Sequence, residues 1–287
     1  MLNMTLKNNI LSILLMVLTI GMAYFSWLLL KSDTSGRDIE KKPDNRKINI
    51  AVAANYKQIL SNSIDKYSLD NEITKDFTIN IISGSTGGLF TQIKNGAPFD
   101  LFLAADMERP QALVQANLTI EDTPYIYTTG KLAIAYRSVN SKEDNCEGND
   151  LNQDELDQLI DHLLKEGEDS KTIVIANPIT APYGKAAERV LEKSKSIEGN
   201  RIKIIRGKDI IHAQQILLSG HADMAFLASH MDKEINQSGV SYCSIDRSLY
   251  PPIQQGMVSI KYKNMNSPSQ LIMNQIITHI KNISDKI

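Results

Sequence analysis

Apolar runs of strand length alternate with amphipathic segments of helix length along most of the chain, starting at about Lys47. Two helical segments stand out, because leucine and isoleucine recur three or four residues apart in Asp154–Lys165 and again near the C-terminus. The C-terminal repeat consists of Ile272, Met273, Ile276, Ile280 and Ile283. The expected strands are Ile48–Ala53, Thr78–Ile82, Phe99–Ala104, Lys131–Tyr136, Thr172–Ala176, Arg201–Ile205 and Asp223–Ala228. This alternation predicts an α/β fold with parallel strands.

The N-terminal segment departs from this pattern, since the run from Ile10 to Leu30 is apolar and carries no charge. As a helix it would be about 30 Å long, enough to cross a bilayer. A secretory signal usually has a shorter apolar core and a small-residue cleavage site, so we favour an uncleaved membrane anchor and keep a cleaved signal as the alternative. The polar stretch Ser32–Arg46 that follows predicts a linker.

Two segments are predicted to cross between domains, Thr123–Gly130 and Ser248–Pro252. A chain that leaves a domain and later returns builds one split and one inserted domain, with two hinge crossovers and a cleft between the lobes. The expected organisation is an anchor or signal with linker over residues 1–46, a split lobe I over 47–126 and 247–287, and an inserted lobe II over 127–246.

The composition is that of a globular protein, with 42% hydrophobic and 22% charged residues. The formal net charge of −2 gives no sign of a nucleic-acid partner, so an anionic ligand would have to be captured by a local site. The two cysteines, Cys146 and Cys243, have no metal-ligand spacing and could form one disulfide or remain two thiols.

The loop Ser83–Gly88 lies between an apolar run and an amphipathic segment, and it consists of serine, glycine and threonine. A small-residue loop at the start of a helix binds anions, because free backbone N–H groups point outward and the helix dipole favours negative charge. Ser85 and Thr86 add hydroxyl donors, and the loop contains no lysine or arginine. Neutral donors of this kind suit reversible binding. The loop fits neither a Walker A motif nor a dinucleotide fingerprint.

Three further strand-to-helix junctions have a related chemistry, at Ala53–Tyr56, Asn177–Gly184 and Gly207–Ile211. Any one of them alone is more often an ordinary cap or turn. Ligands of open α/β sheets lie beyond the carboxyl ends of the strands, so four such helix starts facing one cleft could surround a small tetrahedral anion. Asn55 is expected near an N-cap at the first of these junctions.

No catalytic set emerges from the sequence. The histidines form no H-E-x-x-H pair and are expected in structural or solvated roles, and there is no G-x-S-x-G elbow. Asp100 and Asp106 flank an apolar run, but Asp106 is explained more simply as a cap for the helix that follows. We therefore expect a binding protein and not an enzyme.

Several segments, taken in order, resemble the molybdate-binding proteins of bacterial ABC importers over roughly Ile48 to Ile283. The segments are INIAVAANY, SGSTGGLFTQIKNGAPFDLFLAAD, ANPITAPYGKAA, DMAFLASH and LYPPIQQG. The resemblance implies a two-lobed type II periplasmic binding protein fold, with two mixed sheets flanked by helices and two hinge crossovers. It also implies a periplasmic, monomeric protein that binds molybdate and also tungstate without a cofactor, and delivers the anion to an ABC permease in the inner membrane.

Matched residue by residue, the resemblance implies a ligand set of Asn55, Thr86, Tyr183 and Ile210, with Ala54 and Ser85 as secondary candidates. Tyr183 and Ile210 would contribute backbone N–H groups. Some members of the family add a tyrosine where this chain has Ala225–Ala228, and we expect Asn55 to compensate for its absence. The rival interpretations are a binding protein for sulfate, phosphate or an organic acid, and, less favoured, an enzyme that acts on a small anionic substrate.

Overall fold

The structure is a computed structural model that describes residues 21–22, 47–70, 77–137, 150–165, 170–197, 201–231, 240–261 and 267–284. The chain divides into two units, Met1–Asp44 and Asn45–Ile287, and all elements below belong to the second. Apart from Gly21 and Met22, the predicted Ile10–Leu30 span lies outside the described residues. Within the described ranges, no helix is both long and apolar enough to span a membrane.

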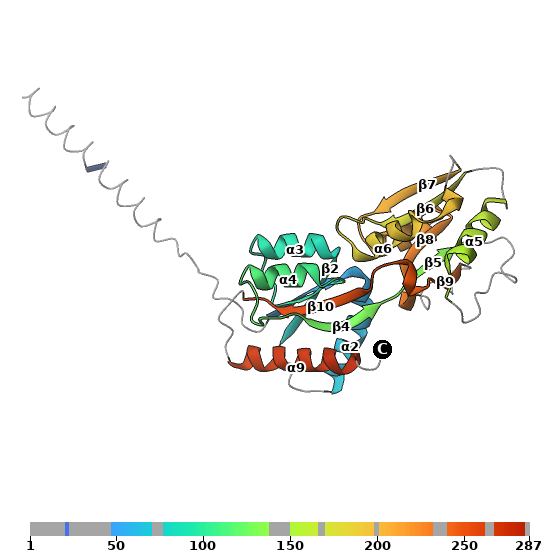
Figure 1. The fold of residues 1–287 in the computed structure, drawn as a ribbon. Coiled ribbons are helices and arrows are strands. Elements are labelled where there is room, and N and C mark those ends of the chain that lie inside the picture. The colour runs from blue at the N-terminus through green and yellow to red at the C-terminus, as the bar shows by residue number, and fades with distance from the viewer. Residues whose placement is uncertain are drawn as a thin grey trace, which may run out of the picture. The chain divides into compact units, whose positions relative to one another are not determined.

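The first sheet has five strands in the order β2-β1-β3-β10-β4. β1 pairs in parallel with β2 and β3, whereas β10 runs antiparallel to β3 and β4. We call this sheet and its helices lobe I (Figure 1). The strands are β1 (Lys47–Ala53), β2 (Thr78–Gly84), β3 (Leu101–Leu103), β4 (Tyr125–Gly130) and β10 (Ile253–Ser259), and the helices are η1 (Ala54–Tyr56), α2 (Lys57–Asp70), α3 (Thr86–Lys94), α4 (Glu108–Gln115) and α9 (Ser267–Ser284).

The second sheet also has five strands, in the order β7-β6-β8-β5-β9, and forms lobe II with its helices. β6 pairs in parallel with β7 and β8, and β5 runs antiparallel to β8 and β9. The strands are β5 (Leu132–Tyr136), β6 (Lys171–Ala176), β7 (Ile202–Gly207), β8 (Met224–Ala228) and β9 (Ser241–Ser244), and the helices are α5 (Gln153–Lys165), α6 (Pro182–Leu191), η3 (Lys195–Ile197), α7 (Ile210–Leu218), η4 (Ser229–Met231) and η6 (Arg247–Leu249).

The residue pattern of β1 explains why lobe I has helices on both faces of its sheet. Ile48, Ile50 and Val52 belong to one apolar cluster with residues of α2 and α9, whereas Ala51 packs into another with residues of α3 and α4. Successive side chains of a strand point to opposite faces, so a strand that is apolar throughout must be covered on both. The same reasoning applies to lobe II, where β5 is buried along its whole length.

All seven expected strands are present, but three strands were missed: β4, β9 and β10. The parallel pairing that alternation predicts holds for β1, β2 and β3 and for β6, β7 and β8. The antiparallel strands β4, β5, β9 and β10 make both sheets mixed, as the resemblance implied.

The two sheets are joined twice, between Gly130 and Leu132 and between Ser244 and Ile253. These links contact each other, because the Leu132 N–H donates to the Tyr250 hydroxyl at 2.8 Å. The predicted lobe limits themselves stay a prediction.

Cys243 on β9 is disulfide-bonded, and Cys146, the chain's other cysteine, lies outside the described residues.

Candidate functional site

The four strand-to-helix junctions meet around one small cavity of about 10 Å³, roughly the space that one water needs. Its lining consists of Ala53, Ala54, Asn55, Gly84, Ser85, Thr86, Ala105, Ala181, Pro182, Tyr183, Asp209 and Ile210. The structure therefore brings together all six residues proposed from the sequence as ligand-binding candidates. That they bind an anion stays a prediction.

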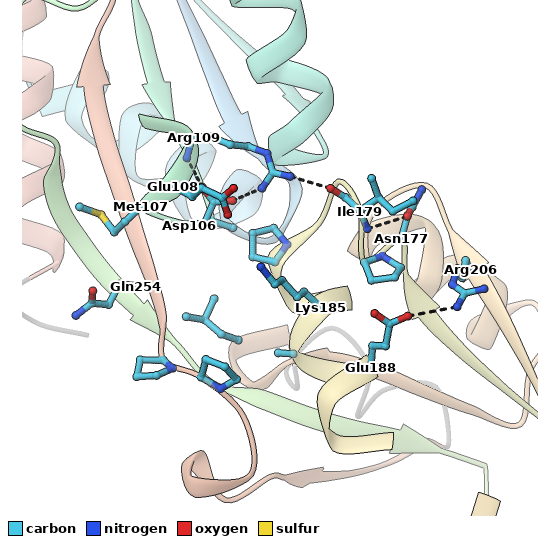
Figure 2. A pocket seen from close by; sticks show the side chains of 17 residues that line it. Asp106, Met107, Glu108, Arg109, Asn177, Ile179, Lys185, Glu188, Arg206 and Gln254 are labelled. Carbon is cyan, nitrogen blue, oxygen red and sulfur yellow. Dashed lines mark hydrogen bonds and ion pairs between the residues drawn. The ribbon is translucent and has the colours of Figure 1, made fainter. Parts of the chain in front are cut away.

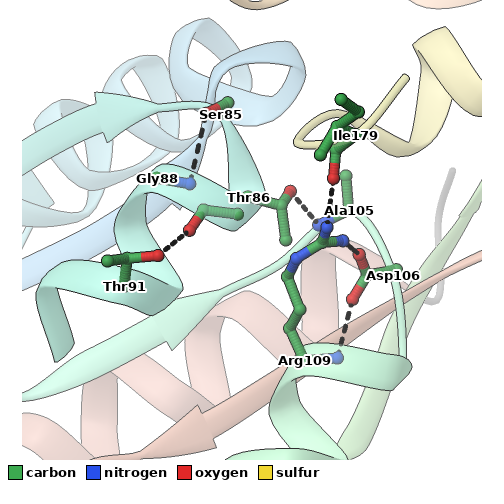
Figure 3. Close-up of polar contacts among 9 residues, drawn as sticks. Ser85, Thr86, Gly88, Thr91, Ala105, Asp106, Arg109 and Ile179 are labelled. Carbon is green, nitrogen blue, oxygen red and sulfur yellow. Dashed lines mark hydrogen bonds and ion pairs between the residues drawn. The ribbon is translucent and has the colours of Figure 1, made fainter. Parts of the chain in front are cut away.

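The start of α3 contributes two hydroxyl groups to this cavity (Figure 3). Ser85 is the N-cap, and its Oγ accepts a hydrogen bond from the Gly88 N–H at 3.2 Å. Thr86 is 1% exposed, and its Oγ1 accepts from the Ala105 N–H at 3.1 Å. Each hydroxyl oxygen is thus used as an acceptor, which leaves the hydroxyl hydrogen to donate to another group.

Backbone amides at three helix starts form the second set of donors. The first N–H groups of an α-helix have no acceptor within the helix. In the part of the chain that the structure describes, the amides of Thr86, Tyr183 and Ile210 have no hydrogen-bond partner. Their neighbours are paired: the Lys185 N–H donates to the Ala181 carbonyl at 3.1 Å, and the His212 N–H to Asp209 Oδ1 at 2.9 Å.

Local sequence explains why α6 presents an amide here. Pro182 occupies the first helical position, where its missing N–H costs nothing, so the first available amide is that of Tyr183. Gly184 follows because a Cβ at this position would lie 2.1 Å from the Ala176 carbonyl oxygen. Glycine therefore lets the first turn of α6 pack against the last carbonyl of β6.

No lysine or arginine is among the described residues that line the cavity, so attraction of an anion would have to come from dipoles. The N-terminal ends of α3, α6 and α7 each carry partial positive charge. The one acidic residue in the lining is Asp209, whose buried carboxylate caps α7.

Asn55 lies near an N-cap, as predicted: it belongs to η1, two residues after the N-cap Ala53. Its Nδ2 donates to Gln255 Oε1 at 3.0 Å, and that oxygen also accepts from the Tyr127 hydroxyl at 3.0 Å. Gln255 Nε2 in turn donates to the Tyr183 hydroxyl at 3.2 Å. A buried polar network thus connects two predicted site residues from different lobes.

This network is uncharged at neutral pH. Burial raises the pKa of the Tyr127 hydroxyl well above its usual value, and burial does the same for the pKa of Tyr183. Gln255 is 1% exposed and was missed by sequence reasoning as a functional residue. Its only signal was its place in LYPPIQQG, one of the segments that carry the resemblance.

Further contacts between the lobes surround the cavity. The Gly87 N–H donates to the Thr180 carbonyl at 2.8 Å, and Arg109 donates to the Ile179 carbonyl at 2.8 Å. His230 Nε2 lies 2.7 Å from the Asn55 carbonyl oxygen, so this nitrogen carries the hydrogen. The contacts of Arg109 and His230 were not predicted from the sequence.

A larger cavity of about 770 Å³ is drawn in Figure 2. It adjoins the small one, because Ala105 and Pro182 line both. Its wall carries acids and bases in balance, namely Asp106, Glu108 and Glu188 with Arg109, Lys185 and Arg206. That balance favours no anion, so the small cavity is the better candidate for an anion site. Ala228, which stands where some family members have a tyrosine, is not among the residues that line either cavity.

Comparison with known proteins agrees with this geometry. A family model described as bacterial extracellular solute-binding protein matches residues 48–271. The chain is 30% identical over 232 residues to the molybdate-binding protein ModA of Azotobacter vinelandii. The aligned region covers 80% of this chain and 83% of that protein. It is 31% identical over 184 residues to ModA of Rhodobacter capsulatus, covering 64% of this chain and 66% of that protein.

The fold is also that of a solved relative. The structure of an Azotobacter vinelandii periplasmic molybdate-binding protein superposes with a TM-score of 0.61 at 22% identity, over 83% of this chain and 97% of that one. With two mixed five-stranded sheets, this likeness confirms the predicted two-lobed type II periplasmic binding fold. Since the family model spans most of the chain and the first relative is covered over more than two thirds of its length, the chain belongs to the bacterial extracellular solute-binding proteins.

Proposed function

We propose that this protein captures molybdate, and also tungstate, outside the cytoplasm and delivers the anion to an ABC permease. The observation that carries the proposal is the meeting of three unpaired helix-start amides, from Thr86, Tyr183 and Ile210, in one cavity. The hydroxyls of Ser85 and Thr86 complete a set of neutral donors. The molybdate-binding activity in the names of two relatives supports this choice of anion.

The binding mechanism follows from the position of the donors on both lobes. The open lobes admit the dianion, the amides and hydroxyls replace its hydration shell, and rotation about the links at residues 130–132 and 244–253 closes the cleft. No covalent step is involved, so the protein acts by binding and not as an enzyme. We place it in the periplasm as a monomer, tethered by Ile10–Leu30 unless that segment is cleaved.

Selectivity over sulfate would come from size, because both anions are tetrahedral dianions. The cavity of about 10 Å³ has to widen to admit either anion. Once wide enough for the larger molybdate, it leaves sulfate with long hydrogen bonds, and each buried donor left unpaired costs about 1–3 kcal/mol.

Phosphate is the second candidate, because of one feature of the wall. The Asp209 carboxylate lines the cavity, and a protonated phosphate could donate a hydrogen bond to it, which fully ionised molybdate cannot do.

Calorimetry on the full-length protein with molybdate, tungstate, sulfate and phosphate separates these cases. We expect one-to-one binding of molybdate and tungstate with no heat from sulfate. Tight binding of phosphate, or of sulfate, would leave the anion site in place but overturn the proposed ligand. The absence of heat from all four anions with folded protein would overturn the proposed function.

A further inference from the structure

One turn of lobe II, Asn177–Ala181, is built as a rigid unit. Asn177 Oδ1 accepts from the Ile179 N–H at 3.0 Å. The Asn177 carbonyl accepts from the amides of Thr180 at 3.1 Å and Ala181 at 2.8 Å. The turn leads directly into Pro182 and Tyr183 at the start of α6, so its position fixes where the Tyr183 amide lies.

Lobe I provides one donor for each of two successive carbonyls in this turn. The Gly87 N–H, at the second position of α3, donates to the Thr180 carbonyl. The guanidinium of Arg109, on α4, donates to the Ile179 carbonyl, as Figure 3 shows. The first bond joins α3, whose first amide is that of Thr86, to the turn that precedes the Tyr183 amide, and the second joins α4 to the same turn. They can form only while the two lobes are together.

Asp106 orients the Arg109 side chain towards the Ile179 carbonyl. The guanidinium forms an ion pair with the Asp106 carboxylate, whose other oxygen accepts the Arg109 backbone N–H at 3.0 Å. A planar guanidinium can serve a carboxylate and a carbonyl at the same time, which a lysine cannot do in the same geometry.

Gly87 makes the close approach of the turn possible. A Cβ at this position would lie 3.1 Å from Thr180 Cα and 3.3 Å from Arg109 Nε, closer than ordinary van der Waals contact. The turn, α3 and the Arg109 side chain are therefore packed against one another at the edge of the anion site.

We propose that Arg109 is a positioning residue that clasps the Asn177–Ala181 turn over the start of α3 and so slows the release of the bound anion. The inference rests on the proposed function. Because the clasp stabilises only the closed state, its loss raises the dissociation rate and leaves the association rate unchanged.

An arginine near an anion site could also act as a plain positive charge, and Asp106 separates the two roles. As a charge, Arg109→Ala would weaken anion binding while Asp106→Asn would strengthen it, because the two substitutions change the net charge in opposite directions. As a clasp, both substitutions weaken binding, because Arg109 without Asp106 is no longer held towards Ile179. Asparagine keeps the oxygen that accepts the Arg109 N–H.

The matched control is Arg206→Ala. Arg206 lines the same large cavity as Arg109, but its ion pair with Glu188 at 3.3 Å lies within lobe II (Figure 2). Stopped-flow rates for molybdate would be measured on the full-length wild type and all three variants, together with the unfolding temperature without ligand.

We expect Arg109→Ala and Asp106→Asn to raise the dissociation rate about tenfold, the effect of a partly exposed hydrogen bond from a charged group. Association rates should stay within about twofold of wild type, as should both rates in Arg206→Ala. The clasp would be overturned if Arg109→Ala left the dissociation rate unchanged or mainly slowed association. Tighter molybdate binding in Asp106→Asn would overturn it as well. A wild type that binds no molybdate would instead overturn the proposed function.

Discussion

Thr86 gives the sharpest test of the site at the scale of one residue. Its Oγ1 accepts from the Ala105 N–H and its hydroxyl hydrogen has no described partner, so Thr86→Val removes a donor from the cavity and leaves a buried amide unpaired. We expect molybdate affinity to fall about tenfold or more by calorimetry. The control is Thr91→Val on the same helix, whose hydroxyl donates to the Gly87 carbonyl and lies outside the cavity. Equal affinity of the Thr86→Val variant and wild type would show that this hydroxyl does not bind the anion.

Among the elements, we expect the helix starts to donate backbone N–H groups to the anion. Ile210 allows a test, because it is the first residue of α7, where proline is tolerated, and Asp209 before it is extended at φ −152°. Ile210→Pro therefore removes the amide without breaking the helix, and Ile210→Ala removes the buried side chain but keeps the amide. Calorimetry should show that the proline variant loses molybdate affinity and the alanine variant retains it. If both variants bind alike, the α7 amide is not a ligand.

Elements also show what the sequence could reveal and what it could not. The helix starts at Thr86, Pro182 and Ile210 were predictable, since small residues, proline and capping acids carry local signals. β10 was not, because Gln255 and Gly256 interrupt its apolar pattern; Gln255 is buried for its hydrogen bonds to side chains distant in sequence. Arg109 was missed for a similar reason, since its partner Ile179 is close only in the folded protein.

For the whole molecule, the buried tyrosines are expected to lower the free energy of unfolding at alkaline pH. Burial raises the folded-state pKa of Tyr127 above its unfolded value of about 10. The contribution of this tyrosine to the free energy of unfolding is therefore complete below about pH 10 and is lost as the pH rises further. Urea unfolding should show a free energy that declines above pH 10, by up to about 1.4 kcal/mol per pH unit for one tyrosine. Tyr127→Phe should decline less steeply, whereas Tyr125→Phe, an exposed position on the same strand, should follow wild type. Parallel curves for all three proteins would contradict this account.

The proposed oxyanion site lies where the starts of α3, α6 and α7 meet. A crystal structure of the protein with molybdate, with anomalous scattering recorded at the molybdenum edge, locates the metal atom directly. We expect one molybdenum peak, whose bound oxygens lie within hydrogen-bonding distance of the Thr86, Tyr183 and Ile210 amides. A peak in the larger cavity beside Lys185 and Arg206, or no peak in well-ordered crystals, would contradict this expectation.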